Sequence, residues 1–359
     1  MAVNRYFPDK VSPTGGTLKE VLENAGMTQA QLAQRCGRPL KTINEIIKGK
    51  AALTPETALQ LELVLGVPAA FWNERERNYQ EYLARQKEQD AFKQQLGWLR
   101  NFPVKAMMEH GLIPRRSTPM EILPELLSFF GIASVKQWKL SRQPHNFSVA
   151  YRRSPRFESD KYALSVWLRQ GEREAANMNC RPYDKAKFLA ALHAARKISN
   201  NTDPGEFVPD LQKVCAAAGV AVVFVRELPG TRATGATRWL SKDKALIQLS
   251  LRHKSNDILW FTFFHEAGHI LLHEKKKFFV EGVVSDEYEK KADEFATDFL
   301  IEPAAYKGFL AAGALDRGAI LSFASKCGVP PAIVAGRLKH DSRLPWSACC
   351  DLTVRYSWK

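Results

Sequence analysis

The sequence lacks the cysteine spacings that would mark a zinc ribbon or a disulfide-bonded domain. Its six cysteines are scattered along 359 residues, and no two of them form a Cys-x-x-Cys pair. Structural zinc sites are usually rich in cysteine, and disulfide frameworks concentrate cysteines in short secreted chains. We therefore expect reduced thiols and assign no site to them.

Long apolar segments are also missing. No segment approaches the run of about 18 apolar residues that a membrane-spanning helix needs. Residues 1–16 are polar and contain prolines and glycines, without the apolar core of a signal peptide. The chain has no internal repeat, low-complexity tract or glycine-rich phosphate loop. We expect a cytoplasmic protein that does not contact membranes, with two or three globular domains.

Four residues of the C-terminal half are spaced as in a catalytic metal site. His265 and His269 stand four apart in a strongly apolar stretch, so a helix would place both imidazoles on one face with Glu266 beside them. Glu289 lies on the apolar stripe of a second predicted helix, where a carboxylate is costly unless it is paired or binds a metal. Two histidines, a glutamate and a water make an open tetrahedral set, which indicates a zinc hydrolase rather than structural zinc.

Each of these residues has an expected role. His265, His269 and Glu289 would bind Zn²⁺, and Glu266 would be the general base that takes a proton from the activated water and returns it to the leaving nitrogen. Asp293 would accept a hydrogen bond from the far ring nitrogen of a ligand histidine and fix its tautomer. The alternative is that these are two surface histidines with an unrelated acid nearby.

Two features of this half depend on less specific signals. Apolar runs at 220–225, 236–240 and 245–251 predict a small sheet packed on the zinc helices, and 245–251 is our candidate for an edge strand along which a peptide substrate would lie. No spacing rule identifies the donor to the oxyanion of the transition state. Five side chains are candidates for that donor, each of which is equally well structural: Arg238, His253, His273, Tyr288 and Tyr306.

About residues 200–310 resemble the ImmA/IrrE family of metallopeptidases. The resemblance rests on His-Glu-Ala-Gly-His at 265–269 and on 289–303, which runs Glu-Lys-Lys-Ala-Asp-Glu-Phe-Ala and ends in a short apolar run and a proline. It implies a compact gluzincin-like fold with His265, His269 and Glu289 as zinc ligands and Glu266 as general base. It also implies a prokaryotic regulator that cuts a partner repressor of helix-turn-helix fold.

The N-terminal part has the pattern of a helix-turn-helix. The segment 17–26 predicts a helix with Thr17 as its cap and Glu20 in the capping-box position, and 28–37 predicts a second short helix that ends in glycine. A third helix is expected at 39–47. Two short helices joined by a glycine-containing turn are typical of helix-turn-helix proteins.

Residues 14–85 resemble the helix-turn-helix domain of HigA-type antitoxins within the Cro/C1 (XRE) class. The resemblance rests on Thr28-Gln29-x2-Leu32-Ala33 and on the segments 43–50, 53–61 and 71–72. It implies a five-helix domain that inserts the helix 39–47 into the major groove of double-stranded DNA, as a homodimer on paired half-sites. Three side chains would lie near bases and three near phosphates, respectively Lys41, Thr42 and Asn44, and Arg38, Lys48 and Lys50.

The net charge of +14 comes mainly from the middle of the chain. Residues 89–200 carry 19 basic and 9 acidic side chains, or +10, whereas 1–88 (12 minus 10) and 201–359 (21 minus 19) carry +2 each. The segment 139–161 mixes arginines with aromatic residues, as nucleic-acid or nucleotide surfaces do. A solvated basic face above core aromatics explains the same pattern equally well.

We therefore expect a mainly α multidomain chain. The predicted domains are a helix-turn-helix domain (1–88), a basic, mostly helical middle region (89–200) and an α+β metallopeptidase domain with a small sheet (201–359). Three functions stay open: a DNA-bound regulator that cleaves a partner repressor or antitoxin-like protein in a stress or mobile-element response, a HigA-like repressor or antitoxin whose metal domain senses without proteolysis, and a peptidase whose helix-turn-helix only docks protein partners.

Overall fold

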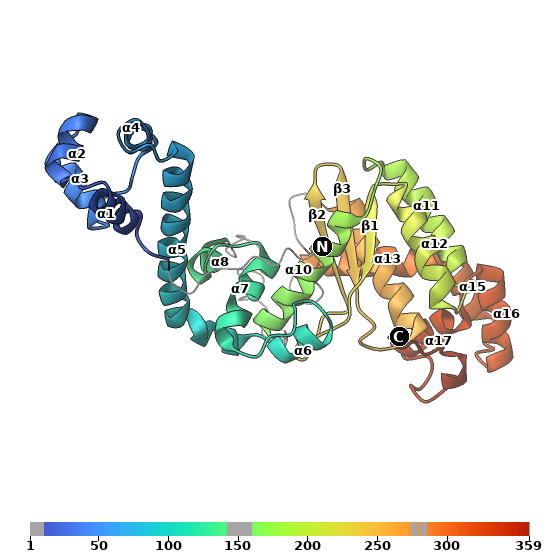
Figure 1. Cartoon of the computed structure of the whole chain (residues 1–359). Helices are drawn as coiled ribbons and strands as arrows, with labels where there is room; N and C mark the ends of the chain where they lie inside the picture. Colours follow the sequence, from blue (N-terminus) through green and yellow to red (C-terminus); the bar gives the residue numbers. More distant parts are fainter. Residues whose placement is uncertain (1–10, 142–159, 274–278, 281–285, 359) are drawn as a thin grey trace. The chain divides into compact units, whose positions relative to one another are not determined.

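The computed structural model describes residues 11–141, 160–273, 279–280 and 286–358. The chain divides into two compact units, Met1–Leu96 and Gly97–Lys359, which we describe separately. It is mainly helical, with a small sheet in the second unit (Figure 1), which confirms the fold class expected from the sequence. The division into three domains with boundaries at 88 and 200 stays a prediction.

The first unit is a bundle of five helices around an apolar core. They are α1 (Thr14–Asn24), α2 (Gln29–Cys36), α3 (Leu40–Ile47), α4 (Pro55–Leu65) and α5 (Ala69–Gln95). Each helix contributes a side chain with no exposed surface to this core, namely Leu18, Leu32, Ile43, Leu61 and Trp72. Burial of such side chains contributes roughly 1.5–3 kcal/mol each, so this core holds α2 and α3 in their turn geometry.

The start of α2 agrees with the sequence prediction, and the start of α1 does not. Thr28 forms a capping box with Gln31, and Gly37 ends α2 in the left-handed conformation. In contrast, α1 begins at Thr14 after Pro13, so the prediction that Thr17 caps it was wrong. The cause is packing: Gly15 places the first turn of α1 directly against the backbone of α3.

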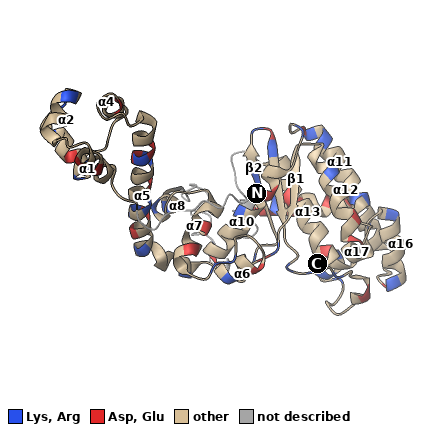
Figure 2. Cartoon of the chain, in the orientation of Figure 1, with Lys and Arg blue, Asp and Glu red and all other residues tan. Residues whose placement is uncertain are grey.

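The long helix α5 is polar and carries charges of both signs. Figure 2 shows Lys and Arg interleaved with Asp and Glu along it. Three exposed ion pairs at helical spacing, Arg77–Glu74, Arg85–Glu81 and Lys93–Asp90, link neighbouring turns. Such pairs contribute about 0.2–0.5 kcal/mol each to an exposed helix. Helix α5 ends at Gln95, where a 3-10 turn η1 (Leu96–Asn101) follows.

The second unit surrounds a four-stranded sheet with helices. Its helices before the sheet are α6 (Val104–Glu109), α7 (Pro119–Phe130), α8 (Val135–Ser141), α10 (Lys161–Asn177), α11 (Lys185–Ile198) and α12 (Pro204–Ala216). The strands are β1 (Val220–Phe224), β2 (Gly235–Ser241), β3 (Lys244–Leu249) and β4 (Phe279–Val280). The remaining helices are α13 (Asn256–Leu272), α14 (Asp286–Leu300), α15 (Pro303–Ala311), α16 (Arg317–Cys327), α17 (Pro331–His340) and the 3-10 turn η2 (Cys350–Leu352).

The three predicted strands exist, but the predicted edge strand lies inside the sheet. The strand order is β1-β3-β2-β4, with β3 parallel to β1 and antiparallel to β2. The prediction that residues 245–251 form a free edge for a substrate was therefore wrong. The residues of β3 from Ala245 to Leu249 are all buried, as in a strand with both neighbours and both faces covered.

Side chains alternate between two cores on the two faces of the sheet. On one face, Val223 of β1 and Leu246 of β3 pack with Trp167 of α10. On the other, Val222 and Ile247 join the larger core that contains α11, α12 and α13 (Figure 1). This period of two is what an extended strand requires. Helix α10 therefore covers one face of the sheet and shares its core.

Residues 142–159 lie outside the described residues, and they make up most of the segment 139–161, for which a nucleic-acid surface and a solvated basic face stay open. Among the described residues, no single helix is long and apolar enough to cross a membrane. Helices α16 and α17 pass that test of length and composition only as a pair, and they are bent by 115° relative to each other.

Replacement of Gly15 by alanine should destabilise the first unit. The added Cβ would lie 2.1 Å from the carbonyl oxygen of Ile46 and 2.5 Å from Cα of Ile47, so α1 or α3 must shift. Overpacking of this kind costs about 1–3 kcal/mol, which urea unfolding would measure. The matched control is Gly16→Ala, whose Cβ meets nothing within 4 Å and should stabilise the helix slightly. Equal midpoints for the two variants would contradict the close packing of α1 on α3.

Candidate functional site

The two helices that carry the motif residues, α13 and α14, pack closely because small residues meet where they touch. A Cβ on Gly268 of α13 would lie 3.3 Å from Cα of Ala292 on α14 and 3.1 Å from the ring of Phe295. Helix α13 is apolar on nearly all sides and buried from Thr262 to Leu271. A helix that is hydrophobic all round belongs in a core, so its two buried histidines require a specific partner.

That partner is Glu289 on α14. The Nε2 atoms of His265 and His269 are 3.0 Å apart, and the Glu289 carboxylate oxygens lie 3.4 Å from the first and 3.6 Å from the second. Two ligands of a tetrahedral zinc-like ion, each at about 2.0–2.1 Å from it, are about 3.3 Å apart. Two imidazole nitrogens and one carboxylate oxygen at these separations therefore fit a small divalent metal ion.

A second carboxylate orients the first histidine. Nδ1 of His265 donates a hydrogen bond to Oδ1 of Asp293 at 2.8 Å, which leaves Nε2 facing Glu289 and His269. Asp293 lies one turn after Glu289 on α14, at the position expected from the sequence. Metal-binding histidines commonly donate their other ring N–H to a carboxylate in this way.

The same contacts set the charge of the metal-free site. Burial lowers the pKa of His265, but its hydrogen bonds to Asp293 and Glu289 outweigh burial and raise that pKa to about 10. Burial and then the neighbouring His265 lower the pKa of His269. Without a metal, His265 is therefore held in its charged form at neutral pH, with a second proton at Nε2. A metal ion must displace this proton in order to bind.

Glu266, the expected general base, lies between α13 and the start of β2. Its side chain is fully buried. A Cβ on Gly235 would lie 2.5 Å from its Oε1, so only glycine allows β2 to approach this carboxylate. The hydroxyl of Thr237 donates to the backbone carbonyl of Glu266 at 3.1 Å. The sequence did not indicate Gly235 or Thr237, because their proximity to Glu266 depends on how the sheet packs on α13.

Three of the five candidate oxyanion donors lie away from this site. The hydroxyl of Tyr306 donates to Asp341 at 2.8 Å, and its ring lies under a guanidinium. Arg238 pairs with Glu172 of α10, on the face of the sheet opposite to α13. His253 precedes α13, and roughly 14 Å of helix separates the start of α13 from His265.

The other two candidates, His273 and Tyr288, lie beside the metal residues. The rings of His269 and His273 are 5.2 Å apart, and those of His273 and Tyr288 are 4.7 Å apart, centroid to centroid. Only these two of the five candidates are shown next to a candidate ligand.

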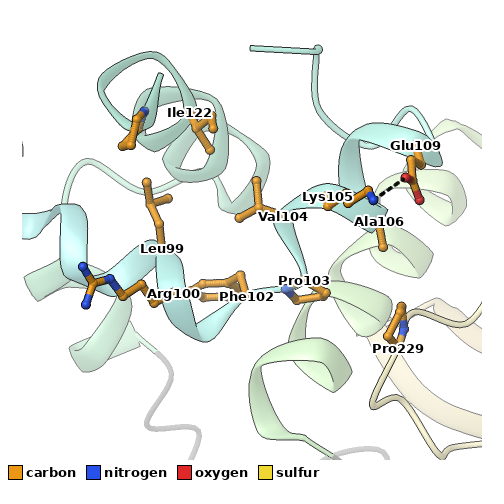
Figure 3. A pocket seen from close by; sticks show the side chains of 11 residues that line it. Leu99, Arg100, Phe102, Pro103, Val104, Lys105, Ala106, Glu109, Ile122 and Pro229 are labelled. Atoms are coloured by element: carbon orange, nitrogen blue, oxygen red, sulfur yellow. Dashed lines mark ion pairs between the residues drawn. The ribbon is translucent and has the colours of Figure 1, made fainter. Parts of the chain in front are cut away.

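A separate apolar pocket of about 580 Å³ lies in the second unit (Figure 3). It is formed by η1, α6, the start of α7 and Pro229, with the ion pair between Lys105 and Glu109, 3.9 Å apart, at its edge. Its lining holds no histidine and a single carboxylate, so it is not a second metal site. This pocket could not be predicted from the sequence, because three separate parts of the chain form it: 99–109, 119–122 and Pro229.

The residues predicted to contact DNA gather around α3. Ile43 and Ile46 anchor the helix in the core, and Lys41 is 85% exposed. Asn44 donates to Gln29 of α2 at 3.2 Å. Arg38 donates to Gln60 of α4 at 2.8 Å. Thr42 is partly exposed, and Lys48 and Lys50 are exposed just after the helix. The two glutamine partners were not foreseen, because the sequence alone does not show which side chains face each other between helices.

Comparison with known proteins identifies the two parts. Residues 18–72 match a family model described as "Helix-turn-helix", and residues 220–339 match one described as "IrrE N-terminal-like domain", a peptidase family. Residues 18–72 thus resemble a helix-turn-helix family and residues 220–339 an IrrE-like peptidase family, as the sequence analysis expected for these two parts. No curated protein matches the chain.

Three solved structures are similar to the N-terminal part. One is a putative antidote protein of a plasmid maintenance system from Nostoc punctiforme PCC 73102 (22% identity, 24% of this chain and 93% of that one, TM-score 0.23). Another is an addiction module antidote protein of the HigA family from Coxiella burnetii (24% identity, 24% and 94%, TM-score 0.22). The third is antitoxin GraA (24% identity, 23% and 90%, TM-score 0.22).

Removal of a candidate ligand should remove the metal. We expect the purified chain to bind about one zinc ion, and His265→Ala or Glu289→Gln to lose most of it, because an open site with three protein ligands cannot spare one. Elemental analysis after dialysis measures this. The matched controls are His340→Ala and Glu294→Gln, which change exposed side chains elsewhere in the unit. Full metal content in both ligand variants would contradict the assignment.

Replacement of the exposed residues of α3 should weaken binding to DNA. We expect Lys41→Ala with Asn44→Ala to reduce the affinity for a DNA site selected with the full-length chain by roughly tenfold or more, since each base contact contributes about 1–3 kcal/mol. Lys19→Ala removes an exposed charge of α1 and is the control. Deletion of residues 1–88 should abolish sequence-specific binding. Specific binding by the deleted chain would place recognition in the basic middle region.

Proposed function

We propose that this chain is a DNA-binding transcriptional regulator with zinc-dependent endopeptidase activity, which cleaves a partner repressor or antitoxin-like protein in a stress or mobile-element response. The observation that carries this proposal is the set of three donor atoms, from His265, His269 and Glu289, within 4.8 Å of one another in a peptidase-family segment. The helix-turn-helix in the same chain supports the regulatory part.

The donor set favours zinc among divalent metals. Two imidazoles and one carboxylate, with a further position for water, are the ligands of catalytic zinc in hydrolases. When bound there, zinc polarises a peptide carbonyl and lowers the pKa of water towards neutrality. Asp293 supports this by holding His265 in the tautomer that presents Nε2 to the site.

Glu266 is the residue that would move the proton. It follows His265 directly and lies in a dry environment between α13 and β2. As general base it takes a proton from the attacking water, and as general acid it gives that proton to the leaving amine nitrogen. Gly235 leaves the Glu266 side chain the room that it occupies between α13 and β2.

The N-terminal unit would bring the peptidase to its target. We propose that α3 enters the major groove of double-stranded DNA and that the chain binds paired half-sites as a homodimer. In this proposal residues 1–88 recognise DNA, 89–200 connect the two activities, and 201–359 cut the protein substrate. A repressor bound to a neighbouring site would then meet the peptidase at high local concentration.

A second candidate function is a HigA-like repressor or antitoxin that binds metal without cutting. The complete burial of Glu266 favours it, since a general base must reach the water that it activates. The experiment on Glu266 below separates the two candidates.

Glu266→Gln should abolish cleavage and leave the metal in place. The amide cannot accept the proton, so cleavage of the repressor or toxin encoded beside this chain should fall by about 10²-fold or more, because general bases contribute about 10²–10⁴. Mass spectrometry of the incubated partner measures this, and Glu294→Gln is the control with an exposed glutamate changed.

Two outcomes would argue against the peptidase. Equal cleavage by the Glu266→Gln variant would remove Glu266 from the chemistry. Absence of a cut by the zinc-loaded wild-type chain would favour the second candidate function.

A further inference from the structure

A hydrogen bond joins the end of α13 to the beginning of α14. His273 follows the last residue of α13, and its Nε2 lies 3.3 Å from the backbone carbonyl oxygen of Tyr288. A carbonyl only accepts hydrogen bonds, so Nε2 carries the proton and donates it. Tyr288 directly precedes Glu289. One side chain therefore links the helix of both candidate histidines to the backbone beside the third candidate ligand.

The imidazole of His273 also packs between two residues of the site. It lies one helical turn beyond His269, with the ring centroids 5.2 Å apart. On its other side, its ring meets the ring of Tyr288 edge to face, at 4.7 Å and 87°. His273 stands just past the end of α13, where its backbone N–H still donates to the carbonyl of His269 at 3.3 Å.

The backbone of α14 is thereby held both before and after Glu289. One turn later, Ala292 packs against Gly268, and one residue earlier the carbonyl of Tyr288 is bound to His273. Ordering a chain segment costs conformational entropy, so a backbone that is already held at Tyr288 and Ala292 leaves less to order when a metal binds. Preorganised ligands bind metals more tightly than ligands that must first be assembled.

We propose that His273 is a positioning residue of the metal centre, which holds the first turn of α14 so that Glu289 faces His269 before a metal ion binds. Its Nε2–H is engaged by the Tyr288 carbonyl, so its role is to place a ligand and not to touch the substrate. This inference rests on the metal centre in the proposed function, and its test separates the two.

Two variants of the full-length chain separate the hydrogen bond from the ring packing. His273→Phe keeps an aromatic ring against His269 and Tyr288 but has no donor, whereas His273→Gln keeps a donor at a similar reach. We expect the Co²⁺ affinity of the Phe variant, measured by competition with a chelator, to fall by about 10–100-fold, as for other residues that orient metal ligands. The Gln variant should stay near wild type. His340→Phe, at an exposed histidine of α17, is the control.

The visible absorption of bound Co²⁺ reports the geometry of its ligands independently of turnover. We expect the bands of the Phe variant to shift or weaken, with those of the Gln variant unchanged. Wild-type affinity and spectrum in the Phe variant would overturn the proposal. An equal loss in the Phe and Gln variants would overturn it too, because the hydrogen bond would then not be the cause.

Hydrogen exchange in the metal-free chain tests the same contact without any metal. The amides of the first turns of α14, in peptides covering 287–296, should exchange faster in the Phe variant than in wild type or the Gln variant. Unchanged exchange would overturn the role of His273. If the wild-type chain binds no Co²⁺ yet shows this exchange pattern, the metal centre fails and the positioning contact stands.

Discussion

The close contact between α13 and α14 is the constraint on which the candidate site depends. Gly268 and Ala292 leave so little between the helices that Glu289, one turn before Ala292, reaches both histidines. A larger side chain at either position would separate the helices and move the carboxylate away from the imidazoles. The small residues inside the two motifs are therefore as necessary as the ligands, although they contribute no donor atom.

The sheet makes the second half of the site. Strand β2 approaches α13 at Gly235 and places the buried Glu266 between helix and sheet, while α14 supplies Glu289 and Asp293 from the other side of α13. Strand β2 thus contacts α13 at Glu266, whereas α14 contacts it at Gly268 and His265. Because these packing contacts are separate, a change that displaces Glu266 need not displace Glu289.

The clustering of the candidate metal ligands was predictable from the sequence, because local geometry determines most of their arrangement. A spacing of four fixes His265 and His269 on one helix face, and the apolar stripe of the next helix indicates which acid is buried. The position of β3 at the centre of the sheet was not predictable, because strand order depends on pairing between distant segments. The prediction that Thr17 caps α1 was wrong for the same reason, because the contact of Gly15 with α3 extends the helix to Thr14.

Helix α10 has a consequence for how the segment that resembles a peptidase is joined to the rest of the chain. It lies before the segment that matches the peptidase family, yet Trp167 fills the apolar face of the sheet beside Val223 and Leu246. A chain that began at residue 201 would leave this face open to water, and an uncovered apolar sheet invites aggregation. The part of the chain from α10 (Lys161–Asn177) onward therefore belongs to the folded core around the sheet, and a shortened chain that keeps the sheet should keep α10 as well.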